Sequence, residues 1–426
     1  MRILLIGVNY APDLIGVAKY NTELCETLTS LGHEVRVITA PPYYPEWNIP
    51  PAYRGWGYRS ETINNVSVTR APIYVPARPT GVRRLVHHAS FAVTSLWPVA
   101  SVALHWRPDV VFSVAPSLMS AAFAAWMARR VGALSWLHLQ DFEVDAAFDL
   151  GLLGNRRLRA PMVAVERRIL RSFDCVSTIS PQMLDRLASK GVDREKIHEF
   201  RNWTDISQIA PGDRLTRFRQ QLNLDASHFV ALYSGTMSNK QGLDLIVEAA
   251  RSLDQTGSPI RFVMCGEGPH RTMLQDLAAG LTNMQFLGLQ AGETFAELLE
   301  TADAHLIPQR AEAADLVLPS KLGAIFATGR PVIVMAKPET GLATEVAGAG
   351  LIIPPGDVAA LAAAIRKLAD DPELSDSLGK EARAIALSRW DKASILAGIE
   401  QEFRTLSGDG ELRNSPSGVR LERKIV

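Results

Sequence analysis

Short apolar runs alternate with amphipathic segments along almost the whole chain. In the first half, these runs have the apolar character of strands that are buried on both faces, as in parallel sheets. They lie at 3–6, 35–38, 110–112, 134–137 and 176–179. Between the first two runs, Leu24, Leu28 and Leu31 share one helical face, and Gly32 follows as a natural helix C-cap. The pattern therefore predicts a β-α-β unit at the start of the chain, with similar units after it.

A second series of apolar runs repeats this organisation later in the chain. Its members lie at 229–233, 260–264, 304–307, 332–335 and 350–353. The repetition predicts an α/β protein with two doubly wound, Rossmann-like domains, 1–203 and 204–388, that face each other. A helical pattern from Ser375 to Phe403 predicts a long helix, whose last part, 389–406, crosses back onto the first domain. The Gly-, Ser- and charge-rich tail, 407–426, is expected to be flexible.

Candidate functional residues in the first domain follow predicted strands, where open α/β sheets bind ligands. The loop that ends at Gly16 opens a helix whose free N–H groups suit a phosphate, although a plain β-to-α turn explains this loop equally well. His138 follows the run 134–137 and precedes Asp141, Glu143 and Asp145, so it could hydrogen-bond a polyol. A lone histidine is more often a packing residue, but its position at a strand end favours the site.

The second domain offers two glycine-containing loops after strands. Ser234-Gly235-Thr236 follows the run 229–233, and its small residues would let backbone amides approach a diphosphate, with Lys240 as a point charge. Gly266-Glu267-Gly268 follows the run 260–264 and begins like a dinucleotide fingerprint, but Arg271 occupies the place of the third glycine. This loop could pass under a nucleotide base or simply close the strand.

A third phosphate-binding candidate is the helix start after Pro319. Ser320 and Lys321 precede a helix that begins at Leu322, so unpaired N–H groups and a cationic side chain would lie at one anion-binding end. Ordinary capping would explain Ser320 but not Lys321. Two lysine-bearing helix starts in one domain predict a single phosphate-rich ligand.

Composition and missing motifs narrow the function classes. The 426 residues include 45 Lys+Arg and 45 Asp+Glu, so the chain lacks the net positive charge of a nucleic-acid binder. Three widely spaced cysteines argue against a disulfide framework or a zinc cluster and suit the cytoplasm. The sequence contains no Asp-x-Asp, no His-Glu-x-x-His and no nucleophile elbow. We therefore expect no metal cofactor, and lysines and helix ends would neutralise a bound diphosphate.

The segment 78–107 combines basic residues with an apolar and aromatic run. Arg78, Arg83 and Arg84 precede a stretch that contains Trp97 and Trp106. Such a combination suits peripheral attachment to a membrane surface, and a helix packed in the core of the first domain explains the apolar part equally well. The long uncharged stretch 89–104 is too short for a spanning helix and contains a proline. No signal-peptide pattern is expected, because Pro12 and Asp13 interrupt the first apolar run.

Taken together, these motifs resemble those of family 4 glycosyltransferases, which share the two-domain GT-B fold. The resemblance extends to about Phe403 and includes Gly329-Arg330-Pro331 and Pro355-Gly356-Asp357 besides the loops above. Gln140-Asp141 and the stretch 308–321 are most similar to the colanic-acid, WcaI-like branch of exopolysaccharide glycosyltransferases. Many relatives carry a double glycine where this chain has Ile15-Gly16, and a pair of glutamates two helical turns apart. Ala324 occupies the place of the second glutamate, and Glu312 and Asp315 lie upstream, out of register with the first.

The resemblance implies retaining, metal-independent transfer of a hexose, with fucose as one candidate, from a nucleoside-diphosphate sugar to a lipid-linked oligosaccharide. It implies that Lys240 pairs with the diphosphate and that Gly16 offers it an amide. Ser234, Gly235, Thr236, Gly266, Glu267, Gly268, Ser320, Lys321 and Leu322 would complete the donor site. His138 would contact the transferred sugar, and Asp141 and Asp145 would lie on the acceptor side. A nucleotide-sugar epimerase, a non-catalytic nucleotide-sugar-binding scaffold and a pyridine-nucleotide oxidoreductase remain as alternatives.

Overall fold

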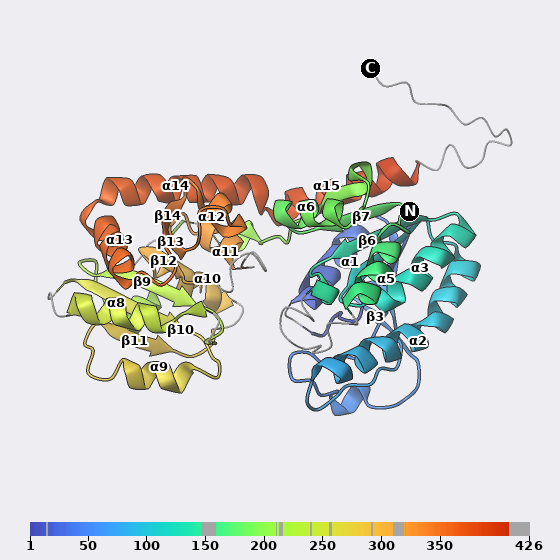
Figure 1. Cartoon of the computed structure of the whole chain (residues 1–426), viewed down its shortest axis with the longest axis horizontal. Coiled ribbons are helices and arrows are strands. Elements are labelled where there is room, and N and C mark those ends of the chain that lie inside the picture. The colour runs from blue at the N-terminus through green and yellow to red at the C-terminus, as the bar shows by residue number, and fades with distance from the viewer. Residues whose placement is uncertain are drawn as a thin grey trace, which may run out of the picture. The chain divides into compact units, whose positions relative to one another are not determined.

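The chain forms two compact units in the computed structural model (Figure 1). The N-terminal unit comprises Met1–Phe200 together with the chain from Leu396 on, and the C-terminal unit comprises Arg201–Ile395. The junction after Phe200 lies three residues before the expected boundary at 203. The structure describes residues 1–13, 16–145, 159–209, 211–212, 216–238, 241–254, 258–290, 293–309, 319 and 321–408. The expected tail therefore lies almost entirely outside the described residues.

The N-terminal unit contains an eight-stranded sheet in the order β3-β4-β2-β1-β5-β6-β7-β8. All neighbouring strands are parallel except β3 and β4, which form an antiparallel pair. The strands are β1 (Arg2–Ile6), β2 (Glu34–Thr39), β3 (Arg59–Ile63), β4 (Val66–Arg70), β5 (Val110–Ala115), β6 (Leu134–Leu139), β7 (Cys175–Thr178) and β8 (Ile197–Glu199). Every apolar run predicted as a strand in the first half is one. The strands β3, β4 and β8 were not predicted.

Helices pack on this sheet and bury its apolar side chains. They are α1 (Val17–Ser30), α2 (Gly81–Trp106), α3 (Leu118–Val131), α5 (Arg159–Leu170) and α6 (Pro181–Ser189), with short 3₁₀ turns η1 (Pro51–Tyr53) and η3 (Arg194–Lys196). The start of α6 illustrates the local logic. Ser180 accepts a hydrogen bond from the Met183 amide, and Pro181 occupies the first turn, where its missing N–H costs nothing.

The last helix, α15 (Lys392–Ser407), contributes to the core of the N-terminal unit. Phe403 is fully buried, and its ring centroid lies 5.4 Å from that of Phe112 and 5.2 Å from that of Trp136. His33 Nε2 lies 2.8 Å from Glu400 Oε1, which ties the same helix to the start of β2. Helix α15 thus packs against β5 and β6 and is joined to the start of β2.

The C-terminal unit is built on a six-stranded sheet in the order β11-β10-β9-β12-β13-β14, in which every neighbouring pair is parallel. Its strands are β9 (Phe229–Ser234), β10 (Ile260–Cys265), β11 (Met284–Leu287), β12 (Ala304–Ile307), β13 (Val332–Met335) and β14 (Gly350–Ile353). Apolar clusters include side chains from both faces of these strands. This double burial explains why its strands are continuous apolar runs in the sequence.

The C-terminal unit also contains α-helices. They are α7 (Arg217–Gln221), α8 (Asp244–Asp254), α9 (Arg271–Leu277), α10 (Glu293–Glu300), α11 (Leu322–Ala327), α12 (Gly341–Val346), α13 (Val358–Asp370) and α14 (Pro372–Arg389), with the 3₁₀ turn η4 (Ile206–Gln208). The single helix predicted from Ser375 to Phe403 was wrong, because α14 ends at Arg389 and α15 begins at Lys392. Asp391 caps the new helix by accepting from the Ser394 amide at 2.8 Å.

The break between α14 and α15 is fixed by backbone pairing with a distant segment. The Thr204 amide donates to the Trp390 carbonyl at 2.8 Å, and the Lys392 amide donates to the Thr204 carbonyl at 3.1 Å. Within the described ranges, no helix is both long enough and apolar enough to cross a membrane.

Candidate functional site

Two loops at the carboxyl ends of β9 and β10 pack directly on each other. The strands are parallel neighbours with Ser234 opposite Cys265, so the loops leave the sheet side by side. The Gly235 amide donates to the Cys265 carbonyl at 2.9 Å, and the Met237 amide donates to the Glu267 carbonyl at 2.9 Å. The residues expected to bind the donor, Ser234 to Thr236 and Gly266 to Gly268, are therefore brought together by the fold.

The glycines in the second loop are needed for this loop-to-loop contact. A Cβ on Gly266 would lie 1.9 Å from the Gly235 carbonyl oxygen, and one on Gly268 would lie 2.3 Å from the Met237 carbonyl oxygen. Their φ angles of 146° and 154° are also strained for residues with a side chain. The sequence left open whether this loop passes under a nucleotide base or closes the strand, and in the structure its glycines allow the two loops to touch.

Lys321 places a cationic group against the first of these loops. Its Nζ donates to the Ser234 carbonyl at 2.9 Å and lies 4.1 Å from the centroid of the Tyr233 ring. A Cβ on Gly235 would lie 3.2 Å from the same nitrogen. The half-buried side chain loses hydration, and this desolvation lowers the pKa of Lys321 to about 7. A bound anion next to Nζ would reverse that effect and favour the charged form.

Ser234 carries a hydroxyl group that is buried without a partner. The residue is 4% exposed, and its Oγ makes no hydrogen bond with any residue in the described part of the chain. Buried polar groups are nearly always hydrogen-bonded, because leaving one unpaired costs about 1–3 kcal/mol. The hydroxyl at the carboxyl end of β9 therefore has hydrogen-bonding capacity that the described residues do not use.

Arg271 fixes the loop after β10 in a way that the sequence analysis missed. Its Nη1 donates to the carbonyls of Gly266 at 2.7 Å and Leu287 at 3.1 Å, and pairs with Glu267 Oε1 at 2.6 Å. Glu267 is largely exposed and is engaged by this arginine. The i,i+4 spacing of Glu267 and Arg271 was the available signal. Arg271, which occupies the place of the third glycine of a dinucleotide fingerprint, thus holds the loop after β10 through these three contacts.

The helix start after Pro319 differs from the expected arrangement of free amides. The Leu322 amide donates to the Pro319 carbonyl at 2.9 Å, and its side chain is fully buried in the core. Leu322 therefore anchors α11 and offers no free N–H to a phosphate. Ala324, at the place where many relatives carry a glutamate, also belongs to that core. Lys240, Ser320, Glu312 and Asp315 lie outside the described residues, so their roles stay predictions.

In the N-terminal unit, His138 is buried at the carboxyl end of β6 with both ring nitrogens engaged. Nδ1 lies 3.0 Å from Ser177 Oγ, and Nε2 lies 2.9 Å from the amide nitrogen of Gln140. Trp136 Nε1 donates to the same Ser177 oxygen at 2.9 Å. Burial lowers the pKa of His138 to about 3. The side chain is thus a neutral imidazole, and with Gln140 oriented as here its proton is on Nδ1.

The acidic residues that follow His138 have different surroundings. Asp141 is exposed, whereas Asp145 is buried and lies 2.9 Å from both Arg186 Nη2 and Lys190 Nζ. Burial would raise the pKa of Asp145, but these two cations hold it below its usual range. Lys190 also pairs with the buried Glu166. Asp145 therefore belongs to an internal ion-pair network, which argues against its expected acceptor-side role.

Glu143 lies between these acids and caps a helix. Its Oε1 accepts from the Leu118 amide at 3.1 Å, at the start of α3. Burial raises the pKa of Glu143 to about 7, so the carboxyl group is partly protonated at neutral pH. Glu143 therefore caps the start of α3, a structural role that the sequence did not reveal.

Gly16 occupies the N-cap position of α1 with a φ of 63°. Only Tyr44 Cε1, at 3.8 Å, lies near the direction of a Cβ, so space rather than crowding surrounds the residue. The backbone conformation itself requires glycine. Gly16 and His138 belong to the N-terminal unit and the donor loops to the C-terminal unit, and their expected meeting across a cleft stays a prediction. No group of three or more His, Cys, Asp or Glu residues in the described ranges could hold a metal ion.

Family models match most of the chain. Residues 16–203 match the model described as a glycosyl transferase 4-like domain, and residues 216–385 match the model described as glycosyl transferases group 1. These two segments correspond to the sheets of the N-terminal and C-terminal units.

Curated relatives include a protein that matches over its full length. The chain is 38% identical over 415 residues to the putative colanic acid biosynthesis glycosyl transferase WcaI of Escherichia coli, covering 95% of this chain and 100% of the relative. It is 24% identical over 414 residues to the glycogen synthase of Mycobacterium tuberculosis, covering 95% and 94% of the two chains.

Solved structures of glycosyltransferases have the same fold. Sucrose-phosphate synthase from Thermosynechococcus elongatus aligns with a TM-score of 0.70 at 20% identity, covering 95% of this chain and 98% of the other. Anabaena HepE in complex with UDP aligns with a TM-score of 0.69 at 16% identity, covering 95% and 100%. WaaG, a glycosyltransferase involved in lipopolysaccharide biosynthesis, aligns with a TM-score of 0.64 at 18% identity, covering 94% of this chain and 99% of the other. These likenesses confirm the predicted GT-B fold.

Proposed function

The chain belongs to the glycosyl transferases group 1 family, and from this premise we propose that it moves a sugar from a nucleoside-diphosphate sugar to a lipid-linked oligosaccharide. The observation that carries the donor assignment is the loop after β9. There a buried, unpartnered Ser234 hydroxyl, a glycine and the Lys321 ammonium group meet at the carboxyl end of a parallel strand. Hydroxyl donors and a cation at such a position suit a diphosphate.

Two relatives support the choice of donor and pathway. The HepE structures are described in complexes with UDP and with UDP-glucose, and this chain shares their fold. The relative in Escherichia coli is named for colanic acid biosynthesis. We place this enzyme in the synthesis of a similar exopolysaccharide, at the cytoplasmic face of the membrane, with a hexosyl and specifically a fucosyl donor as the candidate substrate.

The proposed reaction retains the configuration of the anomeric carbon. The bond from that carbon to the diphosphate oxygen breaks, a bond to the acceptor oxygen forms on the same face, and the leaving phosphate takes the acceptor hydroxyl proton. The protein supplies electrostatic stabilisation of the oxocarbenium-like state rather than a nucleophile. Lys321 and Lys240 balance the diphosphate charge. The neutral His138 is the group assigned to the transferred sugar, where it acts by hydrogen bonding.

Metal independence is part of the proposal and rests on the donor set. The described residues of the β9 and β10 loops, with Lys321, offer hydroxyl, amide and lysine groups, and the acid among these described residues, Glu267, is paired with Arg271. Hydrated Mg²⁺ prefers free carboxylates and phosphate oxygens. Transfer in the presence of a chelator tests this part, and activity that returns only on adding Mg²⁺ or Mn²⁺ would contradict it.

Peripheral membrane attachment is supported by the outward face of α2. Val82, Val86, Val93, Trp97 and Leu104 are all exposed and fall on one side of the helix, with Trp97 70% exposed. The opposite side, which includes Phe91 and Val99, is buried. No Asp or Glu occurs from residue 62 to residue 108. An apolar stripe with an aromatic residue and neighbouring arginines suits the interface of an anionic membrane.

Transfer from labelled donors to membrane lipids tests the proposed function directly. Purified protein is incubated with membranes and one labelled UDP- or GDP-sugar at a time, and lipid-extracted label is counted. We expect label from one donor, loss of label with Lys240→Ala, and normal label with the exposed control Lys367→Ala. NMR of the product reports whether the anomeric configuration of the donor is kept. Absence of lipid label with every donor would contradict the proposal.

A further inference from the structure

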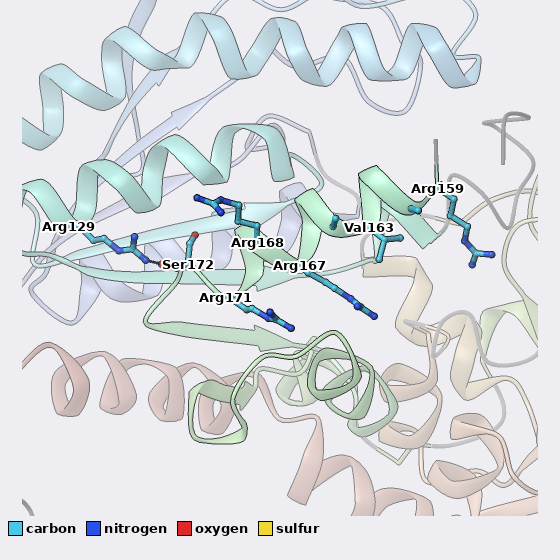
Figure 2. Close-up of a pocket in the computed structure, with 9 residues that line it drawn as sticks. Arg129, Arg159, Val163, Arg167, Arg168, Arg171 and Ser172 are labelled. Atoms are coloured by element: carbon cyan, nitrogen blue, oxygen red, sulfur yellow. Dashed lines mark hydrogen bonds between the residues drawn. The ribbon is translucent and has the colours of Figure 1, made fainter. Parts of the chain in front are cut away.

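A wide groove on the N-terminal unit is lined mainly by arginines from the C-terminal end of α3 and from α5 (Figure 2). Its volume is about 1020 Å³. The basic side chains along it are Arg129, Arg159, Arg167, Arg168 and Arg171. No catalytic or donor-binding role assigned above uses any of them. The groove is far larger than a phosphate ion requires and matches the size of ligand pockets.

The arginines of the groove differ in how they are held. Arg129 donates to the Ser172 carbonyl, and Arg171 Nε donates to the Gly191 carbonyl at 2.9 Å. Arg167 and Arg168 are exposed, and their guanidinium groups make no hydrogen bond or ion pair with another residue of the described part. In Figure 2, Arg168 reaches toward α3, whereas Arg167 and Arg171 extend to the other side of α5. Fixed and free guanidinium groups thus lie along one groove.

No carboxylate in the described part compensates these charges within the groove. The one acidic residue of α5, Glu166, is buried, does not line the groove and pairs with Lys190. Arg171 lies four residues after Arg167 and three after Arg168, so its like charge repels theirs along the helix. The helix dipole favours cations in the last turn of α5, which explains single arginines there but not a lined groove that continues to Arg129.

The groove also has an apolar part. Val163 and neighbouring alanines of α5 form the lining between the arginines. A guanidinium group binds phosphate oxygens in bidentate geometry, whereas an aliphatic lining adds nothing for a simple anion. The combination fits an amphipathic ligand with a phosphate head and an apolar chain.

We propose that this arginine groove binds the diphosphate and first isoprenoid units of a lipid-linked acceptor. The choice of an acceptor lipid rests on the function proposed above, whereas the phosphate and apolar chemistry rests on the groove itself. Diphosphate oxygens contact Arg167, on the side of α5 to which Arg171 also extends, and the isoprenoid chain lies on Val163. The groove thereby holds the lipid end of the acceptor apart from the donor loops.

Titration with farnesyl diphosphate tests the proposal. The probes are farnesyl diphosphate, farnesol, inorganic pyrophosphate, and vesicles of phosphatidylglycerol or phosphatidylcholine, each added to the full chain. The groove variant is Arg167→Gln with Arg168→Gln, and the matched control is Arg366→Gln with Lys367→Gln on the exposed side of α13. Circular dichroism and thermal melting check that both variants fold. We expect the groove variant to bind farnesyl diphosphate at least tenfold more weakly and the control to bind like the wild type.

The other outcomes each overturn a defined part of the proposal. Equal binding of farnesyl diphosphate by the groove variant and the wild type rejects the groove as the site. Pyrophosphate binding as tight as that of farnesyl diphosphate rejects the apolar part of the ligand. Groove-dependent binding of phosphatidylglycerol vesicles without binding of farnesyl diphosphate makes a phospholipid headgroup the ligand and rejects the acceptor lipid. Sugar transfer is assayed separately, so a failure of the proposed function appears as no transfer while the titration still succeeds.

Discussion

Replacing Lys321 with methionine should remove a pH dependence from the stability of the chain. Desolvation lowers the pKa of Lys321 from 10.5 to about 7 in the folded protein, while the unfolded chain keeps the ordinary value. Between these two pKa values the unfolded state binds more protons than the folded state. The free energy of unfolding of the wild type therefore rises as the pH rises through this window, and the burial penalty is fully present below it.

The magnitude follows from the width of the window. Each pH unit inside it changes the contribution by about 1.4 kcal/mol, so two units, from pH 7.5 to 9.5, correspond to about 3 kcal/mol at most. Lys321 is half-buried, and solvent screening reduces this to about 1–3 kcal/mol. Methionine also leaves the Ser234 carbonyl without the bond from Nζ, which costs about 1 kcal/mol at every pH. The slope, and not the absolute stability, is therefore the diagnostic quantity.

Urea unfolding of the wild type and Lys321→Met at pH 7.5, 8.5 and 9.5 measures this slope. We expect the difference in unfolding free energy between the two proteins to change by about 1–3 kcal/mol across the series, in the direction that favours the wild type at high pH. Lys367→Met, at an exposed position of α13, is the control and should follow the wild type. Parallel pH profiles for the wild type and Lys321→Met would refute the assigned desolvation of Lys321.

Three further substitutions test separate parts of the structure. Gly266→Ala should weaken nucleoside-diphosphate binding at least tenfold in calorimetry, because its Cβ meets the Gly235 carbonyl at 1.9 Å, whereas Gly398→Ala, with open space around it, should bind normally. Phe403→Ala should lower the unfolding free energy in urea by about 3–5 kcal/mol, and equal stability would contradict its place in the core. Asp145→Asn should destabilise the fold by about 3–5 kcal/mol by leaving buried Lys190 short of a partner, and a change confined to the acceptor KM would restore its acceptor-side role.

The strands that could be predicted are those with a continuous apolar run, whereas β3, β4, β8 and β11 were not predicted. A strand buried on both faces must be apolar throughout, so runs such as 134–137 and 229–233 could be recognised without any structure. The strands β3 and β8 are edge strands with many polar residues, and β3 pairs antiparallel only with β4. Their position is decided by pairing with a neighbour, which no local pattern records.

Long-range contacts account for the site features that were not predicted. The partner of His138, Ser177, is 39 residues away on the adjacent strand, and the cations around Asp145 lie on and just after α6. The break after Arg389 depends on backbone pairing with Thr204. The sequence alone therefore identified candidate residues by their type and their position near a strand end. It could not predict their burial or ion pairing, which decide whether a candidate can bind a ligand.

The titratable groups of the N-terminal and C-terminal units have different roles in the proposed reaction. Near pH 7, His138 is neutral, Glu143 is partly protonated and Asp145 is compensated by two cations. Apart from the exposed Asp141, the described groups after β6 therefore provide little net charge to oppose a diphosphate. Lys321, with a pKa of about 7, lies against the donor loop, and a bound diphosphate would favour its charged form. Binding of the donor should therefore be accompanied by proton uptake at Lys321, so that the cation forms when the negative charge arrives and the empty loop avoids the full cost of burying it.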